Sequence, residues 1–410
     1  MKTIKDSVHD HIEIDGVARA LLDTPEVQRL RHIKQLGTVS LVYPSANHTR
    51  FEHSLGVYHL AREALSQLGI EGRAAERIRA AAILHDIGHG PYSHNVEDVI
   101  ARHTGNYHED VTDIVAEGAI RSILVDHDLD PNRVADLISG EGQYGGLVSG
   151  ELDVDRMDYL VRDAHHTGVP YGTIDHGRLV RELRFVSGEL VLGEGNVQTA
   201  ESLLVARALM NPTVYSHHVA RISKSMLRRG AERLIVAGTE PEDLRRMDDH
   251  DLLVALRTTE ETKVLARRFA HRDLFKRAVW AELRDVPRDL LDLDYDRRVE
   301  YERTIADRAG VESDAVIIDV PGYPRMTESS TQVIVGGDVR RLDEQSSLVR
   351  TLRQSQLNQW RFGVYAPANV AERVGHATEA VLGLDTDGTL VSDVVPGLHT
   401  TLDRFGSSEE

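Results

Sequence analysis

The chain has no cysteine among its 410 residues, and this absence excludes disulfides, thiolate metal sites and a cysteine nucleophile. It also has no apolar run long enough to cross a bilayer and no signal peptide at its beginning. We therefore expect a cytoplasmic protein that does not span a membrane.

Basic residues are fewer than acidic ones: the chain has 48 basic and 66 acidic residues, and its formal net charge is −18. Phosphate contacts dominate nonspecific binding to nucleic acids and anionic membranes, so such an acidic chain is a poor candidate for either partner. A local basic pocket for a small polyphosphate stays compatible with this charge. The hydrophobic fraction of 41% is ordinary for a globular protein, and the length allows one large domain or two to three small ones.

The most informative stretch is residues 83–94, with the sequence ILHDIGHGPYSH. An apolar run there leads into the pair His85 and Asp86, and imidazole beside carboxylate suits a borderline divalent metal. The glycines and the proline end the preceding helix and let the backbone turn tightly. The competing interpretation is a helix C-terminus with incidental histidines near the negative end of its dipole. Matching groups upstream and downstream favour the metal site.

The matching group upstream is His53. A helix is predicted over 50–68, and His53 lies one turn before Val57 on its inward stripe. His85 shares the inward face of the next predicted helix. If both histidines were ordinary core residues, four buried ring nitrogens would need partners.

The matching group downstream is Asp155, on a helix predicted over 151–166. Asp155, Tyr159 and Asp163 are spaced four residues apart, so they line one face of that helix. A solvated acidic face is the competing interpretation for Asp155, Asp158 and Asp163.

The predicted elements indicate a mainly α fold with a smaller α+β region near the C-terminus. A long helix is predicted over roughly 200–229 with a kink at Pro212, and the charged segment 240–291 has helical spacing. Strands are predicted at 315–320, 331–335 and 361–365, and a last helix at 370–382. Turn formers follow from residue 385, so we expect a loose tail there.

Four of these groups would form a mononuclear metal site with open positions: His53, His85, Asp86 and Asp155. Two imidazoles and two carboxylates suit Mn, Fe, Ni or Zn better than Ca. An open position can polarise a phosphoryl oxygen and lower the pKa of a bound water. Three further histidines could donate protons or activate water near neutral pH: His89, His94 and His108.

Four longer motifs resemble the deoxynucleoside triphosphate triphosphohydrolases, the dGTPase-like members of the HD superfamily of metal-dependent phosphohydrolases. They are residues 23–37 (DTPEVQRLRHIKQLG), 50–56 (RFEHSLG), 85–94 (HDIGHGPYSH) and 153–163 (DVDRMDYLVRD). The likeness spans about residues 1–280 and resembles the catalytic core of the SAM-and-HD-domain enzymes, without a SAM domain. With the predicted elements, we expect an HD phosphohydrolase core over 1–235, a helical extension over 236–310, an α+β region over 311–384 and a tail over 385–410.

The resemblance implies a role for each residue that matches a motif. The metal ligands would be His53, His85, Asp86 and Asp155. The triphosphate would be held by Arg50, Arg156 and Arg207, because guanidinium forks suit phosphate. The proton donor to the leaving 5′-oxygen would be His94, with His89, His108 and either Glu97 or Glu109 in its network. The sugar 3′-hydroxyl would meet Gln35, Leu36 and Asp163. The sugar at C2′ would pack against Tyr159 and Tyr215, for which ordinary core packing is the competing interpretation.

The resemblance also implies a reaction and its control. Attack of metal-associated water at the α-phosphorus would yield a deoxynucleoside and tripolyphosphate, with one divalent transition metal per subunit and Mg²⁺ on the nucleotide phosphates. As an activator, dGTP or GTP would bind between the subunits of a homo-oligomer, either a dimer or a tetramer. The matching effector residues are Lys2, Asp23, Gln28, Arg31, Arg178, Arg272 and Lys276, for which weak surface salt bridges are the competing interpretation. Four positions depart from the family pattern and leave base preference and activation open: Lys5, Arg156, Asn211 and His218.

Two other functions are compatible with the same residues. A phosphodiesterase, exonuclease or nucleotidase would keep the metal and change the substrate. The net charge of −18 argues mildly against long nucleic acids, and Arg156 with Arg207 argues for a triphosphate. A nucleotide-sensing scaffold without catalysis would need only the effector residues, and the intact set of metal ligands with His94 argues against it.

Overall fold

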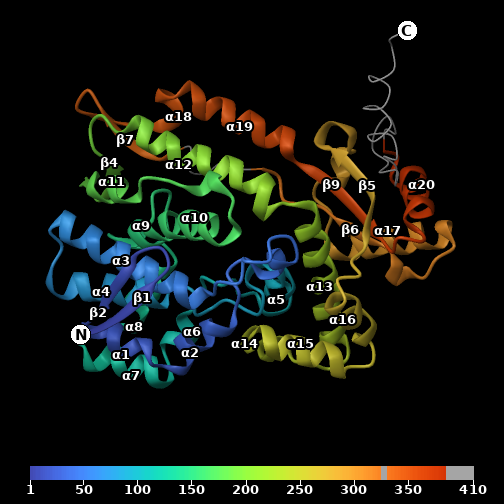
Figure 1. Cartoon of the computed structure of the whole chain (residues 1–410), viewed down its shortest axis with the longest axis horizontal. Helices are drawn as coiled ribbons and strands as arrows, with labels where there is room; N and C mark the ends of the chain where they lie inside the picture. Colours follow the sequence, from blue (N-terminus) through green and yellow to red (C-terminus); the bar gives the residue numbers. More distant parts are fainter. Residues whose placement is uncertain (325–329, 385–410) are drawn as a thin grey trace, which may run out of the picture. The chain divides into compact units, whose positions relative to one another are not determined.

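Helices form most of the first of two structural units, which comprises Met1–Asp273 and residues 330–356 in the computed structural model (Figure 1). The second unit comprises Leu274–Pro324 and residues 357–384. The structure describes residues 1–324 and 330–384, so the tail predicted from residue 385 lies outside the described residues. The elements confirm a mainly α fold with a smaller α+β part. The finer division of the chain into four segments stays a prediction.

A two-stranded hairpin opens the chain. β1 (Lys2–Asp6) pairs antiparallel with β2 (Asp10–Ile14), and Asp6 lies opposite Asp10 in the register. In the turn between them, Asp6 Oδ1 accepts hydrogen bonds from the backbone N–H groups of Val8 (2.9 Å) and His9 (2.8 Å). Asp10 has a φ of 63°, a left-handed conformation that aspartate tolerates better than most residues. The Asp6 carboxylate therefore shapes the turn that carries His9.

The core of the first unit is built around α3 (Arg50–Leu68), which packs against α4 (Gly72–Leu84) and α10 (Val154–Thr167). Glu52 fixes the first turn of α3, because its Oε2 accepts hydrogen bonds from the backbone N–H (2.6 Å) and the hydroxyl (2.9 Å) of Thr49. The apolar stripe of α3 is buried in the main hydrophobic core, as its spacing predicts. α10 ends at Gly168, whose φ of 73° closes the helix.

Shorter helices complete the helical part of this unit. They are α1 (Gly16–Leu22), α2 (Pro25–Arg29), α5 (Glu97–Thr104), α6 (Thr112–Val115), α7 (Gly118–Asp126), α8 (Pro131–Ile138), α9 (Gly145–Val148), α11 (His176–Arg181), α14 (Pro241–Arg246), α15 (Asp249–Thr258) and α16 (Lys263–Ala270). Within residues 1–324 and 330–384, no helix combines the length and the apolar character needed to cross a membrane.

The helix predicted over 200–229 is interrupted rather than kinked. α12 (Val197–Met210) is followed by a π-helical turn at Asn211–Tyr215, and α13 (His218–Val236) begins after it. Pro212 has no N–H group to donate, so a wider turn is favoured over a continuous α-helix. The turn carries Tyr215, whose hydroxyl reaches Asp163 on α10.

A four-stranded sheet also belongs to the first unit. Its strands are β3 (Leu183–Val186), β4 (Glu189–Leu192), β7 (Gln332–Val335) and β8 (Asp338–Arg341), in the order β3-β4-β7-β8. β4 and β7 run parallel, with Leu192 opposite Val333. The strand predicted at 331–335 is confirmed as β7, whereas β3, β4 and β8, which also have four residues each, were not predicted. α18 (Leu342–Gln345) and α19 (Ser347–Gln359) follow β8.

The second unit is an antiparallel sheet with two helices. The strand order is β5 (Lys276–Glu282), β9 (Arg361–Ala366), β6 (Ile317–Asp319), and α17 (Tyr295–Ala309) packs against α20 (Ala371–Leu382). The strands predicted at 315–320 and 361–365 and the last helix are confirmed. β5 lies within the interval where only helices were predicted. Its apolar run is short, and its partner β9 lies far along the chain, so local spacing gave no strand signal.

Candidate metal centre

The first turn of α3 carries the upstream histidine of the predicted cluster. His53 is 1% exposed, and its Nδ1 lies 2.7 Å from Asp158 Oδ2. An ionised carboxylate only accepts hydrogen bonds, so Nδ1 carries a proton and Nε2 is the nitrogen that can bind a metal.

The C-terminal end of α4 supplies the second histidine. His85 Nδ1 lies 2.9 Å from the carbonyl oxygen of Ala82, which also only accepts hydrogen bonds. The Nε2 atom of His85 is therefore the free one, and it lies 3.3 Å from His53 Nε2. Two nitrogens bound to one ion at about 2.0–2.1 Å each lie at a similar separation.

The carboxylate of Asp86 lies beside these two histidines, and its hydrogen bonding indicates whether a cation would fit here. Asp86 is 3% exposed, and its Oδ1 accepts a hydrogen bond of 2.7 Å from Arg50 Nη1. Its Oδ2 has no hydrogen-bond donor among the residues that the structure describes, and it lies 3.9 Å from His53 Nε2. A buried carboxylate oxygen without a donor is costly unless a cation completes it. His53, His85 and Asp86 could therefore hold a divalent metal.

Asp155, the fourth predicted ligand, comes from the first turn of α10. Its Oδ1 lies 2.8 Å from His53 Nε2 and 3.9 Å from His85 Nε2, and its side chain is 33% exposed. The structure thus brings all four predicted ligands together, from α3, the end of α4 and α10. That Asp155 binds the metal stays a prediction.

Burial and charge together set the protonation of the cluster. Burial opposes a charge on His53, but hydrogen bonds to Asp155 and Asp158 outweigh it and raise the pKa of His53 to about 10. Burial would raise the pKa of Asp86, but Arg50 and the histidines hold that pKa well below its usual value. In the metal-free protein, His53 therefore carries a proton that a divalent cation must displace.

Three histidines and a glutamate adjoin the cluster. The rings of His89 and His108 stack with centroids 4.0 Å apart, and the ring of His94 meets them edge-on at 4.7 and 4.9 Å. Glu97 joins two of them, because His94 Nδ1 donates to its Oε2 at 2.7 Å and His108 Nδ1 donates to its Oε1. Although 53% of the His94 side chain is exposed, desolvation by the surrounding groups lowers the pKa of His94, whereas Glu97 outweighs burial and raises the pKa of His108. His89 Nε2 lies 3.4 Å from Asp86 Oδ1, so this group borders the metal ligands.

A cavity of about 100 Å³ lies between these two groups. Its predicted lining residues are Gln35, Arg50, His85, Asp86, His89, His94, His108, Glu109, Asp155 and Tyr159. Ile138, Val148 and Ser149 also line it and were not predicted, because nothing in the spacing of α8 and α9 marks them. Three of the candidate metal ligands, three further histidines and the Arg50 guanidinium therefore face a single small space.

Asp163 and the two tyrosines predicted to meet the sugar form a connected group. Asp163 accepts hydrogen bonds from His48 Nε2 at 2.8 Å and from the Tyr215 hydroxyl at 3.0 Å. The rings of Tyr159 and Tyr215 meet edge-on with centroids 6.2 Å apart. Asp163 is 1% exposed, so the solvated interpretation is wrong for this residue.

Three other predicted substrate residues do not line the cavity: Leu36, Arg156 and Arg207. Arg156 Nη1 donates to the carbonyl oxygens of Gly150 (2.9 Å) and Glu151 (2.6 Å), which ties its guanidinium to the loop before α10. A role of Arg156 at the triphosphate would require these hydrogen bonds to be exchanged for phosphate contacts.

The predicted effector residues fall into several places. Lys2 Nζ lies 3.2 Å from Asp23 Oδ1, and Arg31 Nε donates to Gln28 Oε1 at 2.8 Å. Other predicted effector residues make separate contacts. Arg178 donates a hydrogen bond to Asn196, and Arg272 donates one to the carbonyl oxygen of Leu41. Lys276 belongs to β5 of the second unit.

The residues that surround Asp158 were not predicted from the sequence. Asp158 is 0% exposed, so a solvated acidic face is wrong for it as well. Its carboxylate accepts hydrogen bonds from His53, His9 and Arg162. A sequence signal existed, because Arg162 follows Asp158 by one helical turn and Asp155 precedes it by one. No local signal linked His9 to this helix.

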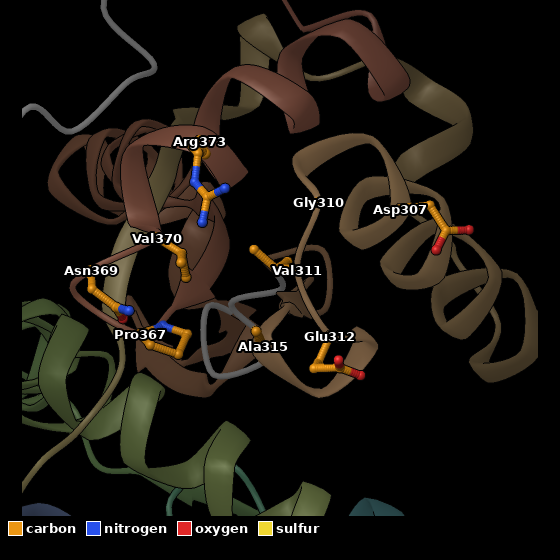
Figure 2. A pocket seen from close by; sticks show the side chains of 9 residues that line it. All are labelled: Asp307, Gly310, Val311, Glu312, Ala315, Pro367, Asn369, Val370 and Arg373. Atoms are coloured by element: carbon orange, nitrogen blue, oxygen red, sulfur yellow. The ribbon is translucent and has the colours of Figure 1, made fainter.

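A second pocket of about 540 Å³ lies within the second unit (Figure 2). It is bordered by the end of α17 and by the segment that leads from β9 into α20 (Figure 2). Its charged lining residues are Asp307, Glu312 and Arg373. Its lining contains no histidine, and the clusters of described residues that could hold a metal lie in the first unit.

Comparison with known families agrees with this geometry. Residues 50–163 match the family described as the HD domain, and residues 174–393 match the family described as the HD associated region. The first match spans His53, His85, Asp86 and Asp155.

Individual proteins show the same relationship. The chain is 35% identical to an uncharacterized protein of Methanocaldococcus jannaschii, over 90% of this chain and 79% of that protein. It spans only about half the length of three uncharacterized bacterial relatives (54%, 51% and 51%). A deoxynucleoside triphosphate triphosphohydrolase SAMHD1 homolog of Dictyostelium discoideum is 28% identical, over 67% of this chain and 59% of that protein. A solved phosphohydrolase of Bacteroides thetaiotaomicron superimposes with a TM-score of 0.72 at 27% identity, covering 90% of this chain and 100% of that one.

Proposed function

The chain belongs to the family of HD-domain phosphohydrolases with an HD-associated region, and from that premise we propose that it hydrolyses deoxynucleoside triphosphates, dGTP among them, to a deoxynucleoside and tripolyphosphate. The name of the Dictyostelium relative, a deoxynucleoside triphosphate triphosphohydrolase, supports this substrate class. The observation that carries the proposal is the shared cavity, where the metal-ligand cluster and the Glu97-linked histidines face the same space. A phosphate ester in that space would reach a cation on one side and a proton donor on the other.

The metal would be held by His53, His85, Asp86 and Asp155. When bound, a divalent metal supplies Lewis-acid chemistry at the phosphoryl group and lowers the pKa of water. Arg50 brings a buried positive charge to the cavity wall, where its Nη1 already holds Asp86 at 2.7 Å. In the proposed reaction, this charge helps to neutralise the phosphates.

His94 would donate the proton that the leaving 5′-oxygen needs. Its Nδ1 is engaged by Glu97, which leaves Nε2 as the atom that can face the substrate. Glu97 also accepts a hydrogen bond from His108 Nδ1 and raises the pKa of His108, so the two histidines share one carboxylate. His89, buried against His108, completes the stack.

The sugar-binding assignment rests on the group around Asp163. Tyr159 lines the cavity, and Tyr215 is held against it by its hydrogen bond to Asp163. Rings packed at C2′ leave little space for a ribose hydroxyl, which supports a preference for deoxynucleotides. Gln35 at the cavity wall and Leu36 next to it in the chain would meet the sugar as well.

The proposal also includes control by a nucleotide. Activation by dGTP or GTP would use the residues predicted for the effector site, in a homo-oligomer in the cytoplasm. The contacts of Lys2 with Asp23 and of Arg31 with Gln28 support a preformed part of that site. The remaining effector residues carry no such support.

A product assay tests the proposal directly. Purified protein with Mn²⁺ is given each deoxynucleoside triphosphate alone and then with dGTP or GTP, and the inorganic products are separated. We expect tripolyphosphate and a deoxynucleoside, loss of this activity in His53→Ala, and full activity in His11→Gln, an exposed histidine of β2. Pyrophosphate, orthophosphate or shortened oligonucleotides in place of tripolyphosphate would show a different phosphohydrolase reaction.

A further inference from the structure

We infer that the N-terminal hairpin is a working part of the metal centre: His9 in its turn, together with Asp6 and Arg162, fixes Asp158, and Asp158 positions the metal ligand His53. Asp6, His9, Asp158 and Arg162 are positioning residues and not metal ligands. The inference deepens the proposed function, because it rests on His53 being a ligand. It concerns metal retention, which is measurable without any substrate.

The contacts form a continuous chain from the hairpin to the cluster. His9 Nε2 lies 2.6 Å from Asp158 Oδ1, and Asp158 Oδ2 lies 2.7 Å from His53 Nδ1. Arg162 binds the same carboxylate with both Nε (2.8 Å to Oδ2) and Nη2 (3.0 Å to Oδ1). The guanidinium also donates to Asp6, from Nη1 to Oδ2 at 2.9 Å and from Nη2 to Oδ1 at 3.2 Å.

Every hydrogen-bonding site of Asp158 is therefore in use, with two donors on each oxygen. The side chains are almost inaccessible to water: 0% for Asp158 and Arg162, 2% for His9 and 3% for Asp6. A buried carboxylate held in this way has one orientation, and so it holds the His53 ring in one orientation and one tautomer. Asp6 has two roles. It binds Arg162, and it accepts hydrogen bonds from the backbone N–H groups of Val8 and His9, which shape the turn around His9.

Gly56 provides an independent observation that this arrangement is built into the helix packing. Gly56 lies one turn after His53 on α3, and a Cβ there would lie 2.5 Å from Arg162 Nη2 and closer still to Asp158 Oδ1. Only a residue without a side chain lets the ion pair approach α3 closely enough for Asp158 to reach His53.

The hairpin thus reaches the candidate metal ligand through Asp158 of α10. A metal ligand whose second nitrogen loses its partner can rotate or change tautomer, and such losses weaken metal affinity by about 10–100-fold. Because the contact comes from residues 6–9, displacement of the hairpin turn would loosen the metal without touching a ligand.

The test measures metal affinity and the state of the His53 ring. Dissociation constants for Mn²⁺ and Co²⁺ are determined by chelator competition for the wild type, His9→Ala, His9→Gln, Asp158→Asn and His11→Gln. We expect about 10–100-fold weaker binding for His9→Ala and Asp158→Asn, near-wild-type binding for His9→Gln, whose amide can still donate to Asp158, and no change for His11→Gln. Imidazole nitrogen NMR should show His53 protonated at Nδ1 in the metal-loaded wild type, with this signature lost or mixed in His9→Ala.

The outcomes separate the possible failures. Equal affinity in wild type, His9→Ala and Asp158→Asn, with affinity lost in His53→Ala, would overturn the positioning role and leave the metal site intact. Unchanged metal affinity in His53→Ala would overturn both the positioning role and the assignment of His53 as a ligand. A folded His9→Ala protein that melts at lower temperature but binds metal normally would show a purely structural contact and also overturn the inference. If metal binding is weakened in His9→Ala and Asp158→Asn as expected, but no tripolyphosphate is formed, only the proposed substrate is rejected.

Discussion

A proton and the proposed metal ion would compete for the Nε2 atom of His53. Although burial opposes the charge, Asp155 and Asp158 raise the pKa of His53 to about 10 in the metal-free protein, against an ordinary value of 6.5. The raised pKa means that this proton stabilises the metal-free fold fully below pH 6.5, and that its contribution is lost as the pH rises through about 10. Over the whole neutral range, metal binding must therefore displace it.

We expect Mn²⁺ binding at pH 8 to release about one proton and the apparent affinity to rise between pH 6 and pH 8, because the ligand must be the neutral imidazole. Calorimetric titrations in two buffers with different ionisation enthalpies would count the protons. His53→Gln should show no such release. A wild-type count near zero at pH 8 would contradict the assignment of His53 as a ligand.

Local spacing was enough to predict four candidate ligands but not the residues that hold them in place. His53, His85, Asp86 and Asp155 follow from the inward faces of three helices, and the structure places their side chains together. Asp158 was given a solvated alternative because an acidic residue on a polar helix is usually exposed. Its burial depends on His9, and a contact between the hairpin and α10 leaves no trace in the spacing of either segment.

At the scale of elements, α3 and α10 meet at Gly56. Gly56→Ala would gain up to about 1 kcal/mol in helix propensity. Overpacking costs about 1–3 kcal/mol, and disturbing a buried ion pair costs about 3–5 kcal/mol, so the packing term wins. We expect a net loss of about 3 kcal/mol, which corresponds to a fall of roughly 6–10 °C in the unfolding temperature.

Thermal unfolding followed by circular dichroism would measure this loss. Gly322→Ala is the matched control, because a Cβ at Gly322 would have no neighbour within 4 Å, and its stability should stay within about 0.5 kcal/mol of the wild type. An equally stable Gly56→Ala protein would show that α3 and α10 can separate without cost.

Elements with a clear local pattern were predictable, and elements that depend on distant contacts were not. The amphipathic spacing of α3 and the β-branched runs of β6 and β7 gave their positions within a few residues. β5 was missed because its stability comes from pairing with β9, a partner that no local pattern reveals. The π-helical turn at Asn211–Tyr215 was missed because Pro212 permits several distortions and only the packed structure selects one.

At the scale of the whole molecule, the two units should respond differently to metal. All four predicted ligands lie in the first unit, so a bound metal stabilises that unit by an amount that grows with its concentration, about 2.7 kcal/mol at 100 times the dissociation constant. We expect two calorimetric transitions, of which Mn²⁺ raises only the one that belongs to the first unit.

Hydrogen exchange with peptide resolution would assign the transitions. Peptides from α3, α4 and α10 should gain protection with Mn²⁺, while peptides from β5, β6 and β9 serve as the internal control. A single transition, or equal protection of both sets, would show that the units unfold together.

The sequence alone was enough to predict the type of site. The absence of cysteine, the deficit of positive charge and the order of the histidine and aspartate motifs point to a candidate metal site of imidazoles and carboxylates on a mainly α fold. Those features are local, because a few consecutive residues are enough to define a helical period and a type of ligand. The tertiary structure decided which polar groups are buried, which arginines reach the cavity and which distant turn supports His53. These depend on contacts between segments far apart in the chain, and such contacts are fixed only when the hydrophobic core brings the segments together.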